Sequence, residues 1–215
     1  MLPQNTAAGE EDIRLQREHI SRKQRNRSLS FVSTGYSENS LLRRVQTIAD
    51  FQFGGYVGPL IFPEGCTFIF STTGRIRQVL SGGVRLATVR ASDGRLTLGI
   101  EGAYRLRDAL PAPGYRVTIR DDVAEFVAKG KNAFAKHVTA ADPQIRAGDD
   151  VMVVAGGDRV IACGAAVISG SEMLAFNYGV AVRVRQGCEK DASGKHQSAP
   201  DEGDDEEARH AGRAD

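Results

Sequence analysis

Residues 130–136, with the sequence GKNAFAK, bring together side chains of the kinds that contact RNA. Lys131 and Lys136 suit phosphate, Asn132 can read a base edge, and Phe134 can stack on an unpaired base. Gly130 allows a sharp turn and a close approach by a nucleotide. We interpret the whole segment, Ala133 included, as a candidate RNA contact. Two alternatives stay open: Gly130 as a plain helix C-cap and Phe134 as a core aromatic.

Paired arginines form a second set of candidate contacts. The run VAVRVR at residues 180–185 alternates strictly, which predicts a strand with Arg183 and Arg185 on one face. In TGRIR, Arg75 and Arg77 flank Ile76 in the same way, and Arg90 follows in a neighbouring strand. We interpret these arginines as a basic stripe for a phosphate backbone. Solvated charges at strand edges are the alternative.

The sequence offers little for catalysis or metal binding. It contains no GxSxG, no Walker loop and no GxGxxG that opens a helix after a strand. The three cysteines lack CxxC spacing, and the four histidines are scattered, so we expect no metal site, no disulfide framework and no cofactor.

Charge is unevenly distributed along the 215 residues, although the net charge is only +1. Residues 41–120 hold eleven arginines, no lysine and five acids, whereas residues 188–215 hold four basic and nine acidic residues. The chain has no apolar run long enough to span a bilayer and no apolar core near its start for a secretory signal. We therefore expect a cytoplasmic protein without membrane contact.

Periodicity predicts two folded modules between two disordered arms, at residues 1–40 and 188–215. The first module, residues 41–113, begins with a helix over SLLRRVQTIADFQF, capped by Ser40 and ended by GGYVGP. Four short strands follow as an antiparallel meander: TFIFS, RIRQVL, VRLATVR and RLTLGI. IEGAYRLRDAL completes this module as a helix.

The second module, residues 114–187, is predicted to have the order β, α, three β, short α, β. Its strands are YRVTI, NAFAKHVTAA, DVMVVAG, RVIACGAAVIS and VAVRVR, and GSEMLAF is the short helix. The first helix, DDVAEFVAKG, is expected to be capped by Asp121 or Asp122 and to bury Val123, Phe126 and Val127. A small mixed barrel would close the edges of so many strands.

The same residues also carry a family resemblance. VAKGKNAFAKHVTAADPQIRAGDDVMVV, RVIACGAAVIS and SEMLAFNYGVAVRVR resemble a PUA domain, a pseudobarrel found in many tRNA- and rRNA-modifying proteins. TIADFQFG, TGRIRQVL and RLATVRASDGRLTLGIEGAYRL resemble the small domain before PUA in archaeal tRNA-guanine transglycosylase and its archaeosine-synthase relatives. This resemblance implies an α+β fold ending in a PUA-type pseudobarrel, and tRNA as the ligand. One departure is DFQFGGYVG, where Tyr56 and Val57 stand in place of a small residue and a glycine.

Transglycosylases exchange bases in a large TIM barrel, for which 215 residues with two β-rich modules leave no room. We therefore expect an RNA-binding, and specifically tRNA-binding, protein without its own active site. It would act alone or as the detached tRNA-gripping subunit of a transglycosylase-like catalytic chain. The alternatives are a protein-interaction adaptor and an enzyme with an unrecognised site.

Overall fold

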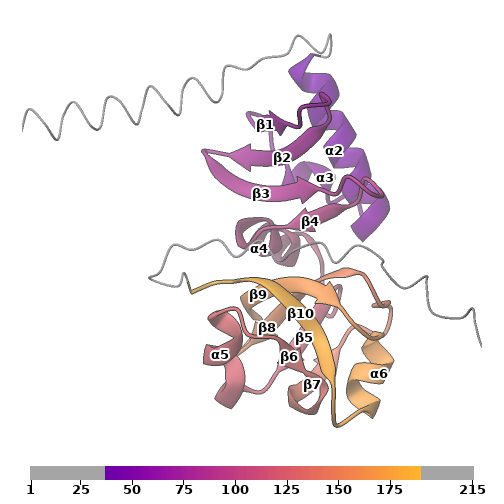
Figure 1. Ribbon diagram of the computed structural model, residues 1–215, viewed down its shortest axis with the longest axis vertical. Coiled ribbons are helices and arrows are strands. Elements are labelled where there is room, and N and C mark those ends of the chain that lie inside the picture. Colours follow the sequence, from indigo (N-terminus) through magenta and orange to yellow (C-terminus); the bar gives the residue numbers. More distant parts are fainter. Residues whose placement is uncertain (1–36, 190–215) are drawn as a thin grey trace, which may run out of the picture.

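The computed structural model describes residues 37–189, so both predicted arms lie almost entirely outside the described residues. The two modules stack one on the other, each built on its own sheet (Figure 1). The predicted α+β class is confirmed. No helix between residues 37 and 189 is both long and apolar enough to cross a bilayer.

Two helices open the first module. In α2 (Glu38–Phe53), Leu41, Val45, Ala49 and Phe53 recur at helical spacing and are buried. The N-cap is Ser37, whose hydroxyl accepts from the Ser40 N–H, so the predicted cap at Ser40 is wrong by three residues. The segment expected only to break this helix contains one helical turn, α3 (Gly58–Ile61), because Pro59 suits the first turn of a helix.

The meander of the first module is confirmed. Its strands pair antiparallel in chain order, and α4 (Ile100–Ala109) packs beneath them. The strands are β1 (Thr67–Phe70), β2 (Ile76–Ser81), β3 (Val84–Val89) and β4 (Leu96–Leu98). Their apolar side chains close over α2 and α4 in one core.

The second module is a six-stranded sheet that curls into a nearly closed barrel, with the order β6-β10-β9-β8-β5-β7. Within the described part of this sheet, β5 and β8 are the one parallel pair. The strands are β5 (Arg116–Ile119), β6 (Ala133–Phe134), β7 (Val138–Ala141), β8 (Asp150–Ala155), β9 (Arg159–Ala166) and β10 (Val180–Gly187). Two short helices, α5 (Ala124–Ala128) and α6 (Gly170–Ala175), complete it.

Three predictions for this module need correction. The strand over residues 132–141 is interrupted by a 3-10 turn at Ala135–His137, which divides it into β6 and β7. Another 3-10 turn, Asp121–Val123, leads into α5, and neither aspartate side chain caps the helix. Phe126 is 63% exposed, because Ala124, Val127 and Ala128 fill the buried side of this short helix.

The two modules share one packed seam. Met152, Val154, Val160 and Cys163 of the barrel belong to the core of the first module. Polar bonds also cross the seam. The Leu98 N–H donates to the Asp150 carboxylate (2.6 Å), and Arg85 donates to the side chain of Gln186 (2.9 Å). These hydrogen bonds constrain how the two modules are oriented, in addition to the apolar contacts. The modules therefore form a single body.

Asp150 makes this seam sensitive to pH. Its carboxyl is buried and also accepts from Arg185, but burial dominates and raises its pKa above the ordinary 3.8. The folded protein therefore holds this proton more tightly than the unfolded chain, so the contribution of Asp150 to stability increases as pH falls toward 3.8.

We predict that wild type gains stability relative to Asp150→Asn when pH is lowered from neutrality. The gain should not exceed about 1.4 kcal/mol per pH unit, the limit for one proton. Urea unfolding of both proteins between neutral pH and pH ~4 measures this difference, since the carboxyls they share cancel. A difference that shrinks on acidification would contradict the raised pKa.

Candidate nucleic-acid interface

Strand pairing brings residues 131–136 next to Arg183, about fifty positions away in the sequence. Phe134 pairs with Val180 and Ala133 with Val182 across β6 and β10. The Asn132 side chain accepts from the Val184 N–H (3.1 Å), so its oxygen is held against the last strand. The two candidate segments therefore lie side by side at one edge of the barrel.

Gly130 sets the direction of this segment. It ends α5 with φ 91°, and the bonds Gly130 N–H to Val127 O (2.9 Å) and Lys131 N–H to Phe126 O (3.1 Å) form a Schellman motif. The helix C-cap considered as an alternative is thus present. The same turn places Lys131 directly after Gly130. Gly130 therefore both caps the helix and sets the position of Lys131.

Three cations at this edge have no acidic partner among the described residues. Lys131, Lys136 and Arg183 are exposed, and none of them forms an ion pair with the part of the chain that the structure describes. Arg116, Arg120 and Lys129 of the same module are all paired with carboxylates. Unpaired cations keep their full charge available for phosphate.

Exposed aromatic side chains lie in the segments that adjoin these cations in the fold. Phe134 is 43% exposed, so it does not serve as a fully buried core aromatic. Phe176 and Tyr178, in the loop before β10, stack with ring centroids 6.0 Å apart. Phe126 belongs to the same region, because its carbonyl accepts from Lys131. The exposure of Phe126 was not apparent from its neighbours in the sequence, Glu125 and Val127.

The remaining predicted site residues lie elsewhere. Arg75 sits in the turn before β2, and Arg77 occupies a β-bulge that interrupts the predicted alternation, both in the first module. At the seam, Arg90 is paired with Asp93 (2.6 Å) and Arg185 with Asp150. The structure therefore does not gather the eleven candidates on one surface. It gathers residues 130–136 with Arg183.

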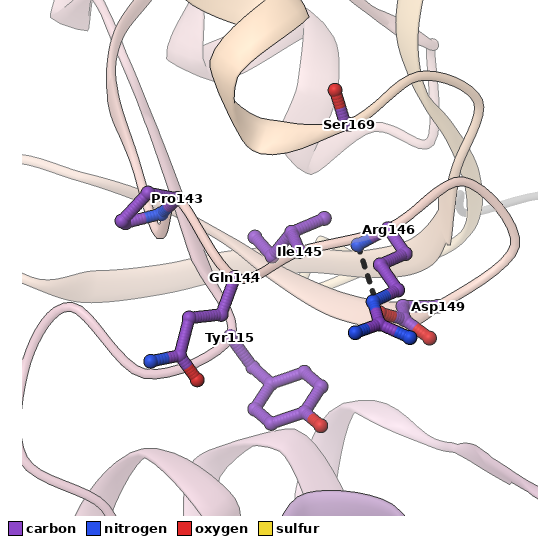
Figure 2. Close-up of a pocket in the computed structure, with 7 residues that line it drawn as sticks. All are labelled: Tyr115, Pro143, Gln144, Ile145, Arg146, Asp149 and Ser169. Carbon is purple, nitrogen blue, oxygen red and sulfur yellow. Dashed lines mark hydrogen bonds between the residues drawn. The ribbon is translucent and has the colours of Figure 1, made fainter.

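A pocket of about 530 Å³ opens beside the seam (Figure 2). Tyr115 forms one wall, fixed by its hydroxyl bond to the Gln52 carbonyl (2.6 Å). Asp149 accepts from the Arg146 N–H and from Arg95, both at 2.9 Å, so this carboxylate holds the loop and the seam. Nowhere between residues 37 and 189 do three His, Cys, Asp or Glu side chains gather as metal ligands would.

Comparisons with known proteins agree with the two modules. Residues 43–113 match the family described as the patch-forming domain C2 of tRNA-guanine transglycosylase, and residues 115–188 match the PUA domain family. The tRNA-guanine(15) transglycosylase of Pyrococcus abyssi is 47% identical over 151 residues, and that of Pyrococcus furiosus is 46% identical over 153. These alignments cover 70% and 71% of this chain but only 26% of each relative.

Solved structures support the fold alone. A hypothetical protein from Pyrococcus horikoshii OT3 superposes with a TM-score of 0.56 at 20% identity, covering 69% of this chain and 90% of that one. A conserved PUA domain protein from Thermoplasma acidophilum gives 0.52 at 20% identity, covering 71% and 91%. This chain thus spans about a quarter of the length of its sequence relatives and most of the length of these structural ones.

Proposed function

Because this chain consists, over residues 43–188, of a C2 domain of the tRNA-guanine transglycosylase type followed by a PUA domain, we propose that it binds RNA and that its ligand is tRNA. The names of its relatives support tRNA, since the matched quarter comes from tRNA-guanine(15) transglycosylases. In this proposal the chain holds the tRNA, and a separate transglycosylase-type chain supplies the chemistry.

The observation that carries the proposal is a set of three cations, on either side of β6 and on β10, that have no ion pair within the described residues. The second module as a whole is nearly neutral, with nine basic and eight acidic residues between positions 114 and 187. Long-range attraction from this module is therefore weak, and contact depends on where the free charges lie. Lys131, Lys136 and Arg183 share one edge with exposed aromatic rings, which suits phosphate and bases together.

We predict that Lys131→Ala and Arg183→Ala each weaken tRNA binding about 3- to 10-fold at moderate salt, and that each lowers the salt dependence by about one counterion. Fluorescence anisotropy with a labelled tRNA at several salt concentrations measures both quantities. Arg120→Ala is the matched control, since Arg120 is exposed in the same module but paired with Asp122. Equal affinity for wild type and both variants would reject this edge as the interface.

The choice of tRNA is tested separately. Intact tRNA, tRNA shortened at its 3′ end and an unrelated hairpin of equal length should bind in decreasing order of affinity. Equal affinities for all three would leave a general RNA-binding protein and remove tRNA from the proposal.

A further inference from the structure

The end of α2 and the segment after it expose large apolar side chains. Phe51 is 93% exposed and Tyr56 is 86% exposed, and Leu60 of α3 is also largely exposed. We call these three residues the Phe51 face. They lie on elements that pack together, because the Gly58 N–H at the start of α3 donates to the Asp50 carboxylate of α2 (2.7 Å). Large apolar side chains left exposed on neighbouring elements are a sign of an interaction surface.

The composition of this segment favours a protein partner over RNA. Thirteen consecutive residues, 51–63, carry no charge, in a chain where 26% of the residues are charged. Depletion of charge and enrichment in aromatic residues characterise the centres of protein interfaces. An RNA surface would need cations to meet phosphate, and this segment contains none.

The backbone of Tyr56 has a strained conformation. Tyr56 has φ 55°, in the left-handed region that costs a non-glycine residue about 1–2 kcal/mol. Its neighbour Val57 is fully buried and anchors the loop from below. The strained backbone of Tyr56 holds its ring in solvent, where the ring gains no contact within the fold. This favours a role for the ring in binding another molecule.

The lengths of the relatives indicate which partner fits. About three quarters of each transglycosylase relative has no counterpart in the alignment with this chain. The Phe51 face belongs to α2, α3 and the segment between them in the first module, whereas Lys131, Lys136 and Arg183 lie on or beside β6 and β10 of the second (Figure 1). A partner on this face would therefore leave the RNA edge open.

We propose that the Phe51 face binds a transglycosylase-type protein chain that lacks its own C2 and PUA domains. The inference rests on the subunit role given under the proposed function. Phe51 and Tyr56 supply the aromatic anchors, and the partner supplies an apolar recess. Residues of this kind at the centre of an interface carry most of its binding energy.

The test uses the purified full chain and a purified transglycosylase-family protein from the same organism whose sequence stops before the C2 domain. Isothermal titration calorimetry should show binding by wild type and binding about 30-fold weaker or more by Phe51→Ser/Tyr56→Asn. Asparagine is chosen because it tolerates the left-handed conformation of residue 56. The tRNA affinity of the double variant should stay within about twofold of wild type, and this result would also show that the variant folds.

Phe126→Ser is the matched control, since it removes an exposed aromatic from α5, the helix that leads into the segment with Lys131. It should lose tRNA affinity and keep the partner. Unchanged partner binding by the Phe51/Tyr56 variant would overturn the inference, as would a wild-type dimer that the variant abolishes. A genome in which every transglycosylase chain carries its own C2 and PUA domains would also overturn it. If the wild-type protein bound the partner but did not bind tRNA, the proposed RNA function would instead be refuted.

Discussion

Replacement of Arg116 by methionine is expected to lower the free energy of unfolding by about 3–5 kcal/mol, mainly through backbone carbonyls that lose their donor. The Arg116 side chain is only 6% exposed and forms an ion pair with Asp158 at 2.7 Å. Its guanidinium also donates to four backbone carbonyls at the end of α4 and in the link to β5, those of Arg107, Leu110, Pro111 and Gly114. Methionine fills similar space but leaves these oxygens without that donor.

The size of this effect follows from the position of the carbonyls. The last carbonyls of a helix have no partner within it and need a donor from elsewhere. Here one guanidinium serves the end of α4 and the whole connection between the modules. Removing it leaves several partly buried acceptors without a donor at once, and each costs about 1–3 kcal/mol when it finds no water.

Urea unfolding of Arg116→Met, Arg116→Lys and Arg120→Met measures the effect. Lysine keeps the charge but cannot reach five acceptors in the fork geometry of arginine, so it should recover only part of the loss. Arg120 is half exposed and paired only with Asp122, and its loss should cost less than about 0.5 kcal/mol. Equal losses for Arg116→Met and Arg120→Met would show that the backbone bonds contribute little.

Much of this fold was predictable from periodicity. The helix over residues 40–53 and the meander of the first module follow from apolar spacing and glycine turns, and the structure places β2, β3 and β4 within one or two residues of their predicted bounds. The errors are local. Ser37 competes with Ser40 for the same cap, and Phe126 lies on a helix of five residues, too short for a reliable period.

The candidate site was less predictable, because it depends on contacts between distant residues. Arg183 and Arg185 are equivalent in an alternating strand, yet Arg185 meets Asp150 and Arg183 does not. Nothing near them in the sequence distinguishes the two. The pairing of β6 with β10, which joins residues 131–136 to Arg183, is likewise a tertiary outcome. The resemblance to PUA domains indicated the region but not which cations stay free.

A change at Gly187 connects this tertiary arrangement to RNA binding. A Cβ atom at Gly187 would lie 1.9 Å from the Ala128 carbonyl oxygen and 2.9 Å from the Gly130 nitrogen, both backbone atoms. The end of β10 therefore rests directly against the last turn of α5, where the segment with Lys131 begins. Because the atoms nearest to this Cβ position belong to the backbone, no flexible side chain can move aside to make room.

Gly187→Ala should thus push α5 and β10 apart, with a loss of about 3 kcal/mol in stability. Because Asn132 and Lys131 follow α5 while Arg183 lies on β10, tRNA affinity should also fall, by about tenfold, under conditions where the variant remains folded. Thermal unfolding and fluorescence anisotropy measure the two effects.

Gly148→Ala is the matched control, since Gly148 has φ 88° but open space around it. It should cost only about 1 kcal/mol through backbone strain and leave tRNA affinity unchanged. If Gly187→Ala lost stability but kept its tRNA affinity, the contact between β10 and α5 would be structural only, and the RNA edge would not depend on the spacing that this glycine permits.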